Sequence, residues 1–98
     1  PVTTVLADGM ACRVADPVAL DILAAHLDHI VKVTDLEVAQ AMRDLYTATH
    51  NVAEGAGAAA FAAAMQERSQ LSGQVVGIAL SGGNVDSETV AKVLMNAA

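Results

Sequence analysis

A short polar loop follows directly on an apolar run at residues 75–80. The run lacks polar alternation, which predicts a strand covered on both faces, as in a parallel sheet. Open α/β sheets bind ligands at the carboxyl ends of such strands, where this loop would lie. The alternative is a tight turn before a helix that begins near Asp86 or Ser87. The loop offers a hydroxyl, a carboxamide and two residues that tolerate positive φ: Ser81, Asn84, Gly82 and Gly83.

The other polar constellations are more typical of surface positions. Glu37 and Asp44 share the polar face of one predicted helix, whereas paired-carboxylate catalysis would need them to converge in a pocket. Cys12 is the single cysteine, which excludes an internal disulfide, and it is interpreted as a small packing residue near a loop. Four further side chains could in principle meet a metal, but they lack zinc-type spacing and favour a solvated helix terminus: His26, Asp28, His29 and His50.

Four helices are predicted, two of them from capping signals. Asp16 and Pro17 have the types preferred at the N-cap and the first helical position. Thr34 and Glu37 form a capping box that opens a second helix, which runs to about His50. The Ala-dominated segment 58–66 predicts a third helix, and a last helix is predicted over about residues 87–96.

Two strands are predicted, over residues 29–33 and 75–80, with the first thirteen residues as a loop or extended segment. A crossover of two helices joins the strands, which indicates a parallel pair in an α/β fold with helices around a small parallel sheet. A buried strand needs neighbours on both edges. The sequence therefore predicts that further strands come from outside these residues.

Composition limits the size of the core. The chain has 98 residues, of which 54% are hydrophobic, but 21 are Ala and only Tyr46 and Phe61 are aromatic. This length allows one domain at most. Either the helices pack very closely through Ala, or the chain depends on a partner surface.

Charge and hydropathy exclude several classes of partner. Eleven acids against five scattered bases give a net charge of −6, which disfavours nucleic acid. No apolar run approaches the roughly 20 residues of a membrane span, and the first residues show no cleavable leader. A cytoplasmic protein without a membrane partner is expected.

Four sequence blocks, in this order, resemble the carboxyl-terminal portion of the threonine/serine dehydratase family. They are LADGM at residues 6–10, VTDLEV at 33–38, AEGAGAA at 53–59 and LSGGNVD at 80–86. Members of this family are pyridoxal-phosphate enzymes of the tryptophan-synthase-β-like fold, fold type II. The resemblance covers residues 4–93 and implies that residues 1–98 are one carboxyl-terminal fragment of the large domain of such an enzyme.

The resemblance implies a cofactor-binding role for several residues. Ser81 matches the position whose hydroxyl bonds to the pyridine nitrogen of pyridoxal 5'-phosphate. A neutral hydroxyl does not hold that nitrogen protonated, so the ring is a weaker electron sink, which favours β-elimination over transamination. Gly82, Gly83 and Asn84 match the loop that shapes this end of the pocket.

Glu54 and Gly9 match two further family positions near the cofactor. Glu54 is either a hydrogen-bond acceptor for the active-site loops or a charge favoured at a helix N-terminus. Gly9 is either a site of close backbone approach to the ring or a simple turn residue.

Two parts of the family's active site have no counterpart in the sequence. Neither Lys32 nor Lys92 stands in the context of the Schiff-base lysine, and no Gly-rich phosphate loop is present. The Gly-containing segment after Glu54 does not suit a phosphate loop, because the Glu54 carboxylate at its start would repel a phosphate group. The isolated residues are therefore expected to be inactive and to need the remainder of the same enzyme.

The resemblance implies an ammonia-lyase that converts an amino-acid substrate, threonine or serine, into a 2-oxo acid and ammonia, and that assembles as a homo-oligomer. No catalytic residue and no metal ligand is assigned to these 98 residues. Two alternatives remain: a non-catalytic α/β module that associates with itself, and part of a serine racemase-like enzyme.

Overall fold

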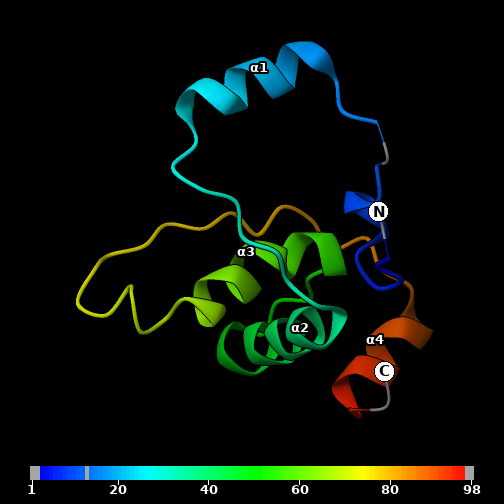
Figure 1. Cartoon of the computed structure of the whole chain (residues 1–98). Coiled ribbons are helices and arrows are strands. Elements are labelled where there is room, and N and C mark those ends of the chain that lie inside the picture. The colour runs from blue at the N-terminus through cyan, green and yellow to red at the C-terminus, as the bar shows by residue number, and fades with distance from the viewer. Residues whose placement is uncertain (1–2, 13, 97–98) are drawn as a thin grey trace.

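The computed structural model describes residues 3–12 and 14–96, which form a short 3-10 helix and four α-helices (Figure 1). The 3-10 helix η1 spans Asp8–Met10 in the predicted loop, of which residues 1, 2 and 13 lie outside the described ranges. The α-helices are α1 (Pro17–His26), α2 (Asp35–Thr49), α3 (Gly55–Gln66) and α4 (Ser87–Leu94).

Local capping explains where three of the helices begin. The Asp16 carboxylate accepts a hydrogen bond of 2.9 Å from the Val18 amide at the start of α1, as predicted. Thr34 and Glu37 form the predicted capping box at α2, with hydrogen bonds of 3.1 and 2.8 Å. Asp86 caps α4 through the Thr89 amide at 2.7 Å.

The ends of the helices differ slightly from the predictions. His50 is not the last residue of α2 but its C-cap, with a left-handed φ of 59°. Helix α3 begins at Gly55 rather than residue 58, because Gly55 and Gly57 lie where other backbone segments pass too closely for a side chain. Helix α4 ends at Leu94 rather than residue 96.

A small core lies where α2 packs against α3 and α4. Ala58 and Ala62 of α3 are almost fully buried, so the prediction of close packing through Ala is confirmed at this contact. Val38 and Val93 are the largest fully buried side chains in the described residues. The molecule measures 40 × 35 × 19 Å, and this flat shape leaves little interior.

The predicted parallel pair of strands is not formed within this chain. The described residues 3–12 and 14–96 contain no strand, and residues 29–33 and 75–80 follow irregular, open courses (Figure 1). A strand exists only when its backbone groups pair with a neighbouring strand. Neither segment meets another strand among the described residues, so the structure of these residues alone does not show the predicted sheet.

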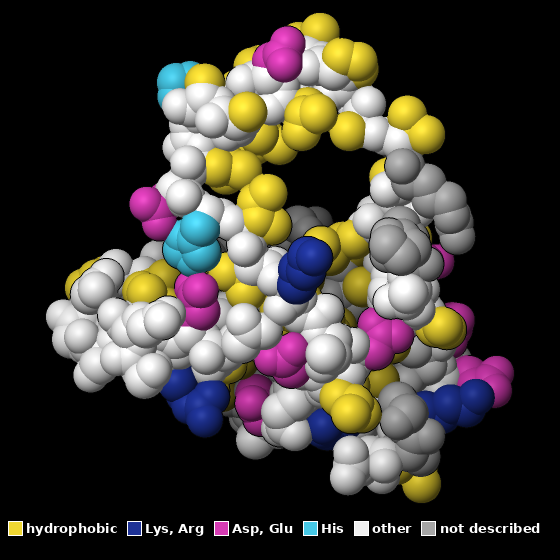
Figure 2. All heavy atoms as spheres, in the orientation of Figure 1, with side chains coloured by type: hydrophobic (Ala, Val, Ile, Leu, Met, Phe, Trp, Pro, Cys, Tyr) yellow, Lys and Arg dark blue, Asp and Glu magenta, His cyan; other side chains and the backbone are white. Residues whose placement is uncertain are grey.

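The apolar side chains of α1 and of residues 75–80 are left without cover. Helix α1 buries no residue, and it contacts none of the other described helices (Figure 1). Its apolar side chains, such as Ile22 at 58% exposure, are open to solvent (Figure 2). Val75 is fully exposed. A helix that is apolar on all sides is normally buried, so these segments have the composition of buried elements.

One histidine connects the segment after α1 to the end of α3. The His29 Nδ1 atom lies 2.6 Å from an Asp28 carboxylate oxygen, and its Nε2 atom lies 3.0 Å from Glu67. The hydrogen bonds that the His29 ring donates to Glu67, and then to Asp28, raise the pKa of His29 above its ordinary value of 6.5. The contact therefore favours the imidazolium form and helps to hold residues 27–34 on α3.

Replacing Glu67 with Gln is expected to lower the pKa of His29 toward 6.5, because Glu67 raises this pKa more than Asp28 does and the substitution removes its charge. Since the folded pKa is raised, the contact stabilises the fold fully below pH 6.5 and is lost as the pH rises through the raised value. Nuclear magnetic resonance titration of the imidazole measures this. Glu88→Gln is the matched control, because Glu88 pairs with Lys92 instead. An unchanged His29 titration in Glu67→Gln would contradict the contact.

Candidate functional site

Three glycine-containing segments meet at the amino-terminal end of α3. Helix η1 packs against α3, and a Cβ atom on Gly9 would lie 3.0 Å from the Ala56 Cβ. A Cβ on Gly55 would overlap the carbonyl oxygen of Leu6 and lie 2.8 Å from the Leu6 carbonyl carbon. The LADGM block thus lies directly on the start of the AEGAGAA block.

The loop that follows residues 75–80 passes over the same end of α3. The Glu54 amide donates a hydrogen bond of 3.0 Å to the Gly82 carbonyl oxygen. A Cβ on Gly57 would overlap that oxygen and lie 2.9 Å from the Gly82 nitrogen, and a Cβ on Gly82 would overlap the Glu54 carboxylate. Gly83 is equally close to its neighbour, since a Cβ there would lie 2.6 Å from the Val52 carbonyl oxygen. Only glycine permits this backbone approach.

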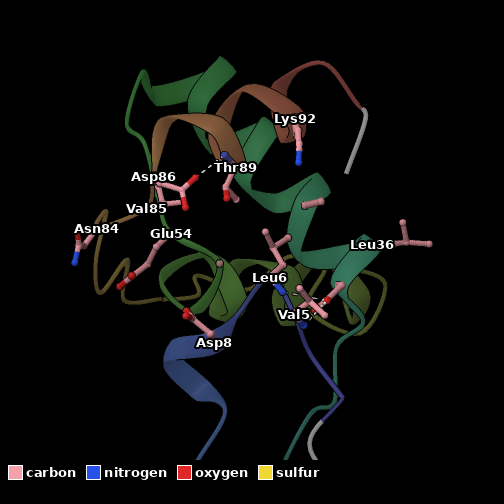
Figure 3. A pocket seen from close by; sticks show the side chains of 13 residues that line it. Val5, Leu6, Asp8, Leu36, Glu54, Asn84, Val85, Asp86, Thr89 and Lys92 are labelled. Carbon is pink, nitrogen blue, oxygen red and sulfur yellow. Dashed lines mark hydrogen bonds between the residues drawn. The ribbon is translucent and has the colours of Figure 1, made fainter.

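A cavity of about 450 Å³ opens beside this junction (Figure 3). The amino-terminal ends of α2, α3 and α4 all contribute to its wall. In Figure 3, Glu54, Asn84 and Asp86 lie on one side of the cavity, and Leu6, Val5 and Leu36 lie on the other. The remaining lining residues are Asp8, Asp35, Ala39, Gly55, Val85, Thr89 and Lys92.

The wall carries more acid than base. Hydrogen bonds, first from the backbone amide of Thr89, lower the pKa of Asp86. Lys92 pairs with Glu88 one turn earlier in α4 at 3.3 Å. The carboxylates and the single lysine make a polar wall that suits hydrogen-bond donors better than a phosphate group.

The structure brings most of the predicted site residues together. Gly9, Gly82 and Gly83 all contact the segment from residue 52 to residue 57, and Asn84 and Glu54 line the cavity. Glu54 is the N-cap residue of α3, but its side chain makes no capping hydrogen bond. Its carboxylate still stands at the amino-terminal end of α3, where a negative charge interacts favourably with the helix dipole, so both interpretations of Glu54 remain open.

Ser81 lies apart from the cavity wall. Its side chain is exposed, and it does not line the cavity, although its neighbour Gly82 lies against the start of α3 and Gly83 lies against Val52. Within residues 3–12 and 14–96, no three His, Cys, Asp or Glu side chains are gathered as metal ligands.

Two residues at this site, Asp35 and Thr4, were missed by the sequence analysis. The Asp35 carboxylate accepts hydrogen bonds from the Thr4 hydroxyl and from the amides of Val5 and Leu6. In the sequence, Asp35 stands out only as part of the helix start at residues 33–38. No local pattern predicts a contact between residues so far apart in the sequence.

Comparison with known proteins identifies the family. Residues 1–82 match the family described as pyridoxal-phosphate dependent enzyme. The chain belongs to this family. It is 39% identical over 95 residues to an L-threonine ammonia-lyase of Geobacter sulfurreducens, which covers 96% of this chain and 23% of that protein.

Other relatives of this chain carry related names. An L-threonine ammonia-lyase of Thermotoga maritima is 33% identical over 89 residues, which is 91% of this chain and 22% of the relative. An L-threo-3-hydroxyaspartate ammonia-lyase of Saccharomyces cerevisiae is also 33% identical, over 91% of this chain and 27% of the relative. The chain therefore spans about a quarter of the length of these relatives. The resemblance to the threonine dehydratase family is confirmed.

The described residues fit one side of the family's cofactor. The glycine junction fixes the backbone of residues 82–83 while the Ser81 hydroxyl stays exposed and able to donate to a ring nitrogen. Neither lysine of the chain suits the other side of the cofactor, since Lys32 is exposed in an open segment and Lys92 is paired with Glu88.

A search of the described residues for membrane-spanning helices found none with the necessary length and hydropathy.

Proposed function

We propose that this chain is part of a pyridoxal-phosphate dependent ammonia-lyase that acts on 3-hydroxy amino acids. The observation that carries the proposal is the convergence of three family blocks at the start of α3 in a chain whose relatives are named L-threonine and L-threo-3-hydroxyaspartate ammonia-lyases. Both named substrates carry a hydroxyl on the β-carbon. Loss of that hydroxyl with a proton, followed by hydrolysis, gives a 2-oxo acid and ammonia, so the atoms balance with water alone.

In this proposal, the chain binds the ring side of the cofactor. When bound, the cofactor withdraws electrons from the α-carbon of the amino acid. Ser81 donates its hydroxyl proton in a hydrogen bond to the ring nitrogen and leaves that nitrogen uncharged. Gly82, which lies against the start of α3, and Gly83, which lies against Val52, would hold the loop so that Ser81 can face the ring, while Asn84 lines the neighbouring cavity.

Glu54 and Gly9 support that arrangement from α3 and η1. The Glu54 carboxylate lines the cavity without capping α3, so its oxygens are placed to accept hydrogen bonds from the active-site loops. Gly9 brings the backbone of η1 close to the start of α3. In this proposal, residues outside these 98 supply the family's Schiff-base lysine and its phosphate-binding loop.

The uncovered apolar segments support the view that the remainder of the enzyme packs on this chain. Residues 29–33 and 75–80 would pair as strands with that remainder, which gives the small parallel sheet and covers α1. An exposed, apolar edge of this kind would otherwise pair with another chain. Self-association of a free-standing module, the second candidate, is favoured by the same exposed side chains.

Turnover assays separate the two candidates. The full-length protein that contains this chain is expected to bind pyridoxal phosphate and to release ammonia and a 2-oxo acid from L-threonine, from L-threo-3-hydroxyaspartate or from both. The 98-residue chain alone is expected to do neither. A full-length protein that binds no cofactor, together with an isolated chain that sediments as a defined homo-oligomer, would refute the lyase and support the module.

A further inference from the structure

A hydrogen-bonded clasp joins the start of α2 to the segment that precedes η1. The Thr4 hydroxyl donates to one oxygen of the Asp35 carboxylate. The amides of Val5 and Leu6 donate to the other oxygen at 2.9 and 3.2 Å. The Thr4 hydroxyl also accepts a hydrogen bond of 3.0 Å from the Ala7 amide. Both carboxylate oxygens thus accept hydrogen bonds from the short segment of residues 4–6.

The clasp lies directly upstream of the glycine junction. Leu6 and Ala7, which it holds, are the residues that pack against Gly55 at the start of α3. Ala7 is buried, and Leu6 packs against the core. Asp8 and Gly9 follow immediately in η1. The position of Gly9 beside Ala56 is therefore set by the bonds to Asp35.

We propose that Asp35 is a positioning residue for the cofactor side of the site, acting through Thr4 and the Leu6–Ala7 backbone on η1. A carboxylate at the first turn of a helix also interacts favourably with the helix dipole, and that role alone would affect only stability. The two roles differ in one respect. Only the clasp connects Asp35 to the segment that carries Gly9.

The protonation state of Asp35 agrees with this role. Partial burial raises the pKa of the Asp35 carboxyl, but the hydrogen bonds from Thr4, Val5 and Leu6 together outweigh that effect and hold the pKa below its ordinary value. The clasp is therefore intact above the ordinary carboxyl pKa of about 4 and is lost as the pH falls through the lowered value. No carboxylate from another element is among the groups that shift this pKa.

Hydrogen exchange of the full-length protein tests the clasp without any activity measurement. In Asp35→Asn the side chain keeps only one acceptor oxygen and no charge, so it can accept from the Thr4 hydroxyl or from the Val5 and Leu6 amides but not from both. The amides of Val5, Leu6 and Ala7 are expected to exchange about tenfold faster or more, as the loss of a hydrogen bond to a charged group implies. Asp44→Asn is the matched control on the same helix, because Asp44 bonds only to Gln40 within α2.

Cofactor binding by the full-length enzyme then tests the positioning role, which rests on the proposed function. Asp35→Asn and Thr4→Val are each expected to weaken pyridoxal phosphate binding by about tenfold to 100-fold, in the range that small misplacements of an active-site group produce. Thr4→Ser keeps the hydroxyl and is expected to restore wild-type affinity. The double variant should be little worse than either single one, because both break the same clasp.

The outcomes separate the two proposals. A wild-type enzyme without lyase activity would end the proposed function, while hydrogen exchange would still decide the clasp. An active wild-type enzyme whose Asp35→Asn variant exchanges faster at residues 5–7 but binds the cofactor normally would overturn the positioning role. Unchanged exchange in both Asp35→Asn and Thr4→Val would overturn the clasp itself.

Discussion

Gly57→Ala is expected to destabilise the 98-residue chain by about 1 to 3 kcal/mol, the usual cost of forcing extra atoms into a packed site. The new Cβ would overlap the Gly82 carbonyl oxygen, and because this neighbour is backbone it cannot rotate away. The expected loss of stability is opposite in sign to the usual effect of this substitution. Within a helix, Gly→Ala ordinarily stabilises by up to about 1 kcal/mol.

Urea unfolding followed by far-ultraviolet circular dichroism measures this difference. Gly77→Ala is the matched control in the same isolated chain, since a Cβ on Gly77 would meet nothing within 4 Å and its change in unfolding free energy should stay within about 0.5 kcal/mol. A Gly57→Ala chain that is as stable as the wild type, or more stable, would show that residues 82–83 do not rest on α3.

Ser81→Ala is expected to lower the turnover number of the full-length enzyme by about tenfold or more, which corresponds to losing one hydrogen bond to the cofactor ring. The substitution removes the hydroxyl but leaves the contacts of Gly82 and Gly83 with α3 intact, so the fold and the substrate KM should change little. Steady-state kinetics and the absorbance spectrum of the bound cofactor measure the two effects separately.

Ser72→Ala provides the control for Ser81→Ala. Ser72 is an exposed turn residue outside the cavity wall, and its loss should change neither the kinetics nor the spectrum. Equal turnover by the Ser81→Ala and wild-type enzymes, with identical cofactor spectra, would remove Ser81 from the site.

Features that depend on local sequence were predicted well. The starts of α1 and α2 follow from Asp16 and from the Thr34–Glu37 capping box, whose bonds span only a few residues. The site residues Gly9, Glu54 and Gly82 came from the family resemblance. The structure adds that Gly9 lies tightly against Ala56 and that Gly82 lies against the Glu54 carboxylate.

Features that depend on distant partners were not predicted. Residues 75–80 have the composition of a buried strand, but a strand needs a paired edge, and the described part of the chain provides none. The contact of Asp35 with Thr4 joins two segments about thirty residues apart, for which neither periodicity nor spacing gives a signal. The sequence likewise gives no sign of what covers the exposed apolar side chains of α1 and of residues 75–80.

A crystal structure of the full-length protein with pyridoxal phosphate bound is the most direct test of the cofactor-site assignment. The Ser81 Oγ atom is expected within about 2.7 to 3.2 Å of the ring nitrogen, at hydrogen-bond distance, with Gly82 still resting on Glu54 and Gly57. Residues 75–80 should then be paired as a strand. A cofactor whose ring nitrogen faces a different residue, or whose phosphate rather than ring lies at residues 81–84, would contradict the assignment.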